Sequence, residues 1–287
     1  MSHSIFITYH IEIVQNMKTV SRKRSYTYRY MTSGEALYAR LRQWLFSEVA
    51  SDHMYPWLRK IEYYAEELQE FLEQTTALWL TARLVSVGRS LYSENGHHYR
   101  TELRPFLREY LVLSRNDLED IERLLGSAVD ASLQNISNGL KNKMLQYAID
   151  QHELCYICGI PLDFLMQDKH SKFTREHIWP RSLGGESIIE NLLPACGKCN
   201  HLRKMDYATW ASTSIQSICT PRSPSDDDWK NLQLSHYYAM HQFAGQSRAI
   251  SEYITLKEAF LDIGPWKCPP KLCDKNDAGH FFNLEVI

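Results

Sequence analysis

The chain is organised around residues 155–204, which read CYICGIPLDFLMQDKHSKFTREHIWPRSLGGESIIENLLPACGKCNHLRK. Two Cys-x-x-Cys pairs in this stretch bracket a segment of 37 residues. A Cys-x-x-Cys turn lets two thiolates face one cation, and two such turns complete a tetrahedral four-sulfur site suited to Zn²⁺. The pattern therefore predicts a structural zinc site without an open coordination position. Its four ligands would be Cys155, Cys158, Cys196 and Cys199.

The alternative for these cysteines is two disulfides or a set of buried free thiols. Disulfides are typical of oxidising compartments, and the N-terminus lacks the charged-then-apolar pattern of a signal peptide. The gap between the pairs is longer than in a simple zinc ribbon. We therefore expect a folded unit to fill the gap, with zinc pinning its two ends together.

Residues suited to phosphodiester hydrolysis lie between and just after the cysteine pairs. Residues 174–178 favour a strand, and Asn200 falls in the first turn of a following helix. Glu176 and Asn200 offer oxygen atoms of the kind that Mg²⁺ or Mn²⁺ prefers. His177 carries an imidazole, the side chain best suited to act as a general base at neutral pH. Hydrolysis needs such a pair, because the base activates water while the cation stabilises charge on the phosphate.

The order of these residues resembles that of the HNH, or ββα-metal, endonucleases, in the variant whose motif reads acid-His, Asn, Cys-x-x-Cys-Asn. The resemblance covers about fifty residues, under a fifth of the chain. It implies that Glu176 and Asn200 ligate a catalytic Mg²⁺ or Mn²⁺ and that His177 is the general base. Asn191 matches the middle Asn of the motif, whose side chain ties the loop of the β-hairpin and so orients the base. The four cysteines match the structural zinc ligands.

The chain departs from the family pattern in two places. Glu176 stands where Asp is commoner, and Arg203 followed by Lys204 stands where the family often has a single Lys. His201 is an alternative to Asn200 as a metal ligand, since some members of the family use His there; otherwise it contacts phosphate or solvent. Cationic side chains of this stretch are predicted to bind nucleic acid. They are Arg175, Arg181, His201, Arg203 and Lys204.

The composition is that of a soluble globular protein and gives no overall attraction to nucleic acid. The 287 residues are 44% hydrophobic and 23% charged, with a net charge of −2. Affinity for a phosphate backbone comes mainly from Lys and Arg. Either the basic residues gather on one face, or a partner delivers the nucleic acid. No apolar run reaches the ~20 residues of a membrane span, so we expect a cytoplasmic protein without membrane contact.

The first 150 residues predict a β-hairpin followed by helices. Residues 5–14 and 26–31 alternate in polarity and favour strands, and their basic link with interleaved tyrosines fits either a nucleic-acid contact or a solvated hairpin. Apolar residues at three-four spacing then predict a helix from Gly34 and a long helix from Pro56 to Asn95. Three further helices are expected over 101–113, from Asn116 as an N-cap, and over 128–150.

The C-terminal part predicts one or two helices over 228–262 and an irregular tail. Cys268 and Cys273 either form a second metal site with His280 or are ordinary thiols. The whole chain predicts an α+β fold that is mainly α-helical, in three domains. These are a hairpin and helical domain at 1–146, an HNH module at 147–215 and a helical and irregular extension at 216–287.

We therefore expect a metal-dependent endonuclease that hydrolyses phosphodiester bonds of DNA, and one site should nick one strand. The resemblance extends to small bacterial HNH proteins of restriction and phage-defence operons, which implies partner proteins of the same system. The alternatives are a non-catalytic zinc module that binds nucleic acid or protein, and an RNA-directed nuclease. A zinc scaffold needs the cysteines but has no use for Glu176, His177 and Asn200.

Overall fold

A computed structural model describes residues 29–45, 65–151, 153–165, 167–203, 249 and 254–265, with only the backbone described for 65–75 and 202–203. The predicted N-terminal hairpin lies outside these ranges, apart from residues 29–31, which are irregular. The start of the long helix at Pro56, most of the predicted 228–262 helices, the tail and its two cysteines also lie outside them. No described helix is long and apolar enough to cross a membrane.

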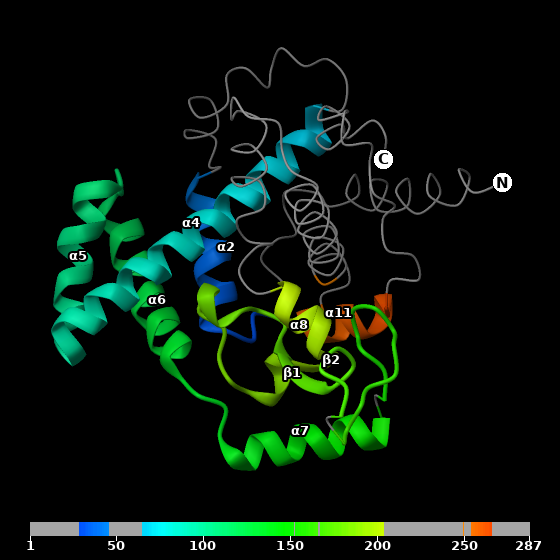
Figure 1. The fold of residues 1–287 in the computed structure, drawn as a ribbon. Coiled ribbons are helices and arrows are strands. Elements are labelled where there is room, and N and C mark those ends of the chain that lie inside the picture. The colour runs from blue at the N-terminus through cyan, green and yellow to red at the C-terminus, as the bar shows by residue number, and fades with distance from the viewer. Residues whose placement is uncertain are drawn as a thin grey trace, which may run out of the picture.

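Four helices form a bundle in the N-terminal half of the described chain (Figure 1). They are α2 (Ser33–Leu45), α4 (Ala65–Asn95), α5 (Tyr99–Tyr110) and α6 (Arg115–Leu133). Each helix buries apolar side chains three or four positions apart on one face, which makes a shared core favourable. Residues central to this core are Leu37, Leu41, Leu84, Val85, Leu103, Leu107, Ile121 and Leu125.

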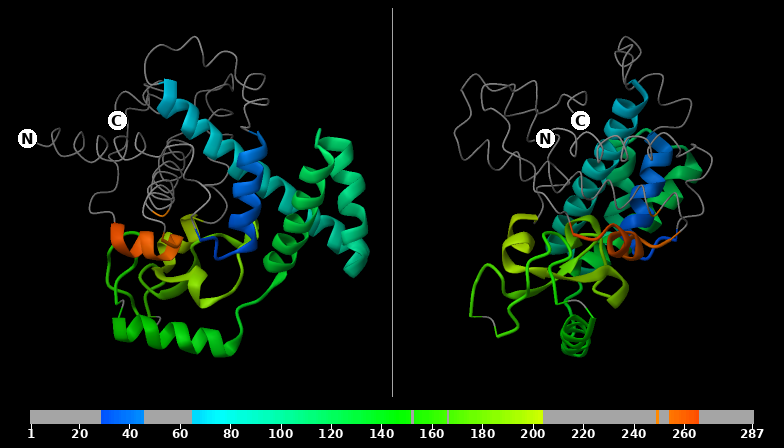
Figure 2. Two further views of the ribbon diagram at one scale, coloured as in Figure 1. Left: turned by 180° about the vertical axis from the view of Figure 1, so that it is seen from behind. Right: turned by 90° about the vertical axis from the view of Figure 1, so that its right-hand side faces the viewer.

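A β-hairpin and a short helix follow the bundle and hold the predicted site. Strand β1 (Phe173–His177) pairs antiparallel with β2 (Leu192–Cys196), and the register places Phe173 opposite Cys196 and His177 opposite Leu192. Helix α8 (Gly197–Arg203) continues directly from β2. This is the predicted ββα arrangement, and the α+β, mainly helical class is confirmed. Helix α7 (Asn138–Gln151) runs along the hairpin on the side away from α4 (Figure 2).

The hairpin and the bundle share hydrophobic core. The cluster around the hairpin includes side chains of α2, α4 and α11 (Leu256–Ile263) as well as those of the hairpin and its loops. Trp179 is 1% exposed in this cluster and packs on Tyr38 of α2, with ring centroids 5.3 Å apart. Helices α2 and α4 thus contribute side chains to both cores. The division of the chain into three domains stays a prediction.

The N-terminus of α2 is joined to the loop between β1 and β2. The Ser33 N–H donates to both carboxylate oxygens of Glu186, at 3.0 and 2.9 Å. A carboxylate is favourable there, because the first N–H groups of a helix lack intrahelical partners. The Gly34 N–H donates to the Gly184 carbonyl at 3.0 Å, and a Cβ on Gly34 would lie 2.0 Å from the Leu183 carbonyl oxygen. Only glycine permits this approach of the helix to the loop.

The start of α6 differs from the prediction. Ser114 is the N-cap, and its hydroxyl accepts a hydrogen bond from the Asp117 N–H at 3.2 Å. Asn116 lies inside the first turn instead of capping it. Ser114 and Asn116 both have side chains that can cap a helix, and the sequence alone does not show which of them is the N-cap. Helix α5 also ends at Tyr110, three residues before the predicted end.

The predicted helix over 128–150 corresponds to α7, but its predicted start is wrong: α6 continues to Leu133, residues 134–137 join the two helices, and α7 begins at Asn138. The Arg181 guanidinium donates to the Ser132 carbonyl at 3.2 and 2.9 Å, and the Ser187 hydroxyl donates to the Gln134 carbonyl at 3.3 Å. The last carbonyl groups of a helix need such partners from outside it. Helix α6 therefore ends where the hairpin loop meets it.

Candidate active site and zinc centre

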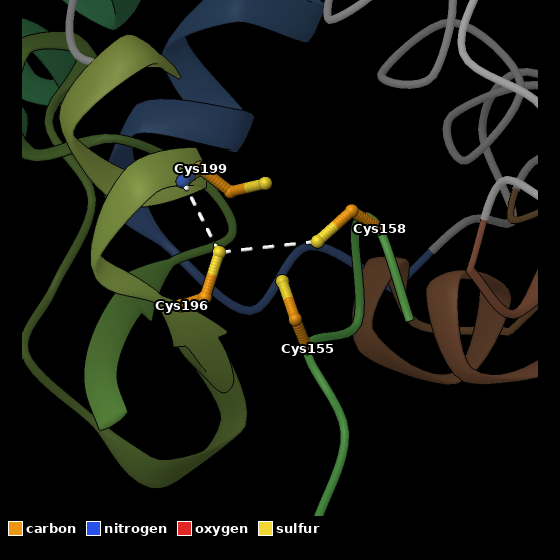
Figure 3. Close-up of side chains that lie close together, drawn as sticks. All are labelled: Cys155, Cys158, Cys196 and Cys199. Atoms are coloured by element: carbon orange, nitrogen blue, oxygen red, sulfur yellow. Dashed lines mark hydrogen bonds between the residues drawn. The ribbon is translucent and has the colours of Figure 1, made fainter. Parts of the chain in front are cut away.

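The four predicted cysteines come together in a geometry that fits zinc. Their sulfur atoms all lie within 4.8 Å of one another. With Zn–S bonds of about 2.3 Å, the edges of a tetrahedral four-sulfur site are about 3.8 Å long. The Cys158 and Cys196 sulfurs are 3.8 Å apart. Figure 3 shows all four side chains pointing to a common centre. They form a metal-binding group suited to zinc.

The two cysteine pairs are held by the backbone around them. The Cys155 N–H donates to the Ile160 carbonyl at 2.9 Å, and Gly159 adopts a left-handed φ of 73° that closes this turn. The Tyr156 N–H donates to the Pro194 carbonyl of β2 at 3.1 Å, which ties the first pair to the hairpin. The second pair straddles the junction of β2 and α8. Metal binding would therefore fix the start of α8 relative to both strands.

The close approach of the sulfurs favours thiolates among them. Hydrogen bonding to the Cys155 thiol lowers the pKa of Cys196 to about 7 and also lowers the pKa of Cys158, whereas hydrogen bonds within the cluster raise the pKa of Cys155 and Cys199. The thiolate is the form that binds a metal ion. Three of the four residues are buried, so negative charge gathers where no water can solvate it fully. A divalent cation at the centre would compensate that charge.

Asn200 lies against β1 on the same side as Glu176. Its amide nitrogen donates to the Thr174 hydroxyl at 3.0 Å and to the Arg175 carbonyl at 3.5 Å. Side chains alternate along a strand, so Thr174 and Glu176 share one face of β1. The amide nitrogen is directed at the strand, which leaves the amide oxygen as the end suited to a cation. Glu176, only 8% exposed, adds a carboxylate on the same face of β1. This donor set fits a hard divalent cation.

His177 is the last residue of β1 and is partly buried. Its Nε2 lies 3.1 Å from the Ser187 hydroxyl, which belongs to the loop that returns to β2. The Ser187 hydroxyl in turn donates to the Gln134 carbonyl, just beyond α6. The imidazole thus contacts the loop that returns to β2.

Asn191 holds the loop between the strands closed. Its side-chain oxygen accepts from the Trp179 N–H at 2.7 Å, and its amide nitrogen donates to the carbonyls of Trp179 and Glu186 at 2.9 and 3.0 Å. Its backbone carbonyl accepts from the Ile178 N–H, next to His177. The side chain is 2% exposed and thereby fixes the segment that follows the base. This geometry suits the tying role that the resemblance implies.

The residues predicted to bind nucleic acid differ in their surroundings. The guanidinium of Arg181 binds the end of α6, and that of Arg175 donates to the Lys141 carbonyl at 3.2 Å and stacks 4.9 Å from the Phe173 ring. Burial lowers the pKa of both guanidinium groups. His201 is exposed on α8. The side chain of Arg203 and all of Lys204 lie outside the described residues.

Two polar residues of the loop between the strands were not predicted. Glu186 caps α2, and Ser187 contacts His177, each through a partner on a distant segment. Both follow Gly185 in a GGES sequence that suggests only a turn. Nothing local distinguishes a capping carboxylate or an orienting hydroxyl from ordinary loop residues. The folded structure is what identifies them.

A hairpin followed by a helix, with four cysteines at its base, defines a zinc-stabilised ββα-metal module. A family model described as HNH endonuclease matches residues 155–207, which span this module. The match assigns the module to the nucleases, a class of hydrolases that act on nucleic acid. No curated protein and no solved structure matches the chain significantly.

Asn191→Asp is expected to destabilise the protein by about 3 kcal/mol. The carboxylate keeps the acceptor for the Trp179 N–H but loses both donors, which leaves two carbonyls facing a buried negative charge. Urea denaturation followed by circular dichroism measures the change. Asn135→Asp makes the same chemical change at an exposed position and should cost almost nothing. Equal unfolding midpoints for the two variants would show that Asn191 does not hold the loop.

Proposed function

We propose that this protein is a metal-dependent endonuclease that hydrolyses phosphodiester bonds of DNA and nicks one strand at each site. The observation that carries the proposal is the placement of Asn200 against Thr174 and Arg175 of β1, the strand that also carries Glu176 and ends at His177. A module that uses zinc only for folding has no need of this set. The match to HNH endonucleases over the same residues supports the proposal.

Each residue has a distinct part in the proposed reaction. Glu176 and Asn200 would hold Mg²⁺ or Mn²⁺, which when bound supplies positive charge to the phosphate and the leaving oxygen. His177 takes one proton from a water molecule, and the resulting hydroxide forms a bond to phosphorus. The bond from phosphorus to the leaving sugar oxygen then breaks, and that oxygen takes up a proton. Asn191 fixes the loop that keeps the base in place.

We also propose that a partner or a separate region directs the nuclease to its substrate. The net charge is −2, and the Arg175 and Arg181 guanidinium groups of the module are bound to backbone carbonyls. The chain as a whole therefore has no excess of Lys and Arg over Asp and Glu, and cationic side chains supply most affinity for a phosphate backbone. Such a need for direction fits the setting of restriction or phage defence, in which other proteins of the same system would be the partners.

Conversion of supercoiled plasmid to open circles is the test of this function. Protein with its zinc in place is incubated with Mg²⁺, with Mn²⁺ or without added cation, and parallel reactions contain single-stranded DNA and RNA. We expect open circles that depend on Mg²⁺ or Mn²⁺ and are lost in Glu176→Gln. Cleavage of RNA alone would make the protein an RNA-directed nuclease. Binding of nucleic acid without cleavage of any substrate would favour a non-catalytic zinc module.

A further inference from the structure

The Ser187 hydroxyl stands between the imidazole of His177 and a backbone carbonyl. Its oxygen lies 3.1 Å from His177 Nε2 and 3.3 Å from the Gln134 carbonyl oxygen. Gln134 immediately follows α6, 53 residues away in sequence from Ser187. The side chain thus joins the base to the helical bundle. No part of the HNH motif described above includes this residue.

The number of protons determines the direction of both hydrogen bonds. A hydroxyl has one proton to donate, whereas a carbonyl oxygen only accepts. The contact with Gln134 therefore uses the proton of Ser187. The contact with His177 then requires that Nε2 carry a proton and that the Ser187 oxygen accept it. In this arrangement the lone pair of the neutral imidazole is on Nδ1.

We propose that Ser187 is a positioning residue for the His177 base, holding the imidazole as the Nε2–H tautomer while the Gln134 carbonyl orients the Ser187 hydroxyl. The base then receives a proton at Nδ1. The same Nε2–H bond persists in the imidazolium that forms, because both nitrogens carry protons in that state. Ser187 therefore supports the ring both before and after proton transfer. The kinetic part of this inference rests on the proposed function, whereas the tautomer follows from the contacts alone.

The tautomer is measured without any nuclease activity. The full-length protein is labelled with ¹⁵N-histidine, and two-bond ¹H–¹⁵N correlation spectra are recorded at a pH where the ring is neutral. The His177 signals are those missing from a His177→Ala spectrum. We expect a protonated Nε2 and an unprotonated Nδ1 in the wild type. In Ser187→Ala we expect loss of this preference, seen as shifts averaged between the two tautomers.

Kinetics test the consequence for catalysis. Ser187→Ala should lower kcat by about 10- to 100-fold, the range for loss of a group that orients a functional histidine. KM for DNA should change by less than about twofold, because Ser187 acts through the base and not on the substrate. Ser187→Thr keeps the hydroxyl and should recover most of kcat. Ser182→Ala, a partly buried serine in the same loop, is the matched control and should behave as wild type.

The outcomes separate this inference from the proposed function. A wild-type spectrum with the proton on Nδ1 would overturn the inference even in an active nuclease. So would a Ser187→Ala variant with the kcat and tautomer of the wild type. A chain that cuts no substrate but shows the Nε2–H tautomer, lost in Ser187→Ala, would uphold the positioning role and overturn only the nuclease function.

Discussion

His177→Ala is expected to lower the rate of plasmid nicking by about 10²–10⁴-fold, which is the usual contribution of a general base. Without the imidazole, water must give its proton to solvent as it attacks phosphorus, so the barrier rises while substrate binding is kept. The effect should therefore fall on kcat and leave KM nearly unchanged. Initial rates of conversion from supercoiled to open-circular DNA, at saturating Mg²⁺ or Mn²⁺, measure it.

The fold should survive this substitution. His177 is partly buried, lies at the end of β1 and contacts a loop hydroxyl, whereas the zinc ligands lie at the opposite end of the hairpin. Zinc content and the thermal unfolding curve of His177→Ala should match those of the wild type. His170→Ala, which removes an exposed imidazole seven residues earlier, should nick at the wild-type rate. If His177→Ala cuts as fast as His170→Ala, the base is another group.

The zinc centre and the hairpin were predictable because their signals are local. Two thiolates in a Cys-x-x-Cys turn can face one cation whatever the rest of the chain does, and two such turns at the ends of one segment demand that the ends meet. The end of α4 at Asn95 was predictable for a similar reason. Gly96 follows with a left-handed φ of 56°, a conformation that ends a helix and suits glycine.

The start of α7 has a local signal, since the Ser137 hydroxyl accepts from the Leu140 N–H at 3.2 Å, but the end of α6 has none. Residues 134–137 read QNIS, without Gly or Pro, and apolar residues continue on either side at helical spacing. The helix ends there because Arg181 and Ser187 of the hairpin loop bind carbonyl groups at its end. These partners are about fifty residues away in the sequence. A periodicity argument considers one helix at a time and contains no term for such contacts.

The same limit applies to the site. Glu176, His177 and Asn200 belong to a pattern with fixed order, so the sequence brings them to notice. Glu186 and Ser187 act through Ser33 and Gln134, which no spacing rule connects to them. Arg175 and Arg181 carry the charge expected of phosphate contacts, which stay a prediction, and in the structure each guanidinium also donates to a backbone carbonyl that the sequence did not indicate. Charge in a sequence indicates what a residue can bind, and the fold determines what it does bind.

Cys155→Ser is expected to release zinc and to destabilise the protein by about 4 kcal/mol or more, because a structural zinc site contributes its binding free energy to folding. That loss is a large part of the 5–15 kcal/mol that typically stabilises a domain. Cys155 is fully buried in the hairpin core, so its replacement also leaves a hydroxyl without a metal partner. Zinc measured by mass spectrometry and thermal unfolding by circular dichroism test both effects.

Cys268→Ser is the matched control, since it makes the same change at a cysteine outside the two pairs. It should keep one zinc per chain and the wild-type unfolding curve; a loss of zinc there would instead support a second site with Cys273 and His280. Cys155→Ser should also lose nicking, because Cys196 and Cys199 flank the β2–α8 junction and Asn200 directly follows them. His177→Ala and Cys155→Ser would then share inactivity but differ in zinc and stability. Retained zinc and an unchanged unfolding curve in Cys155→Ser would refute the four-cysteine centre.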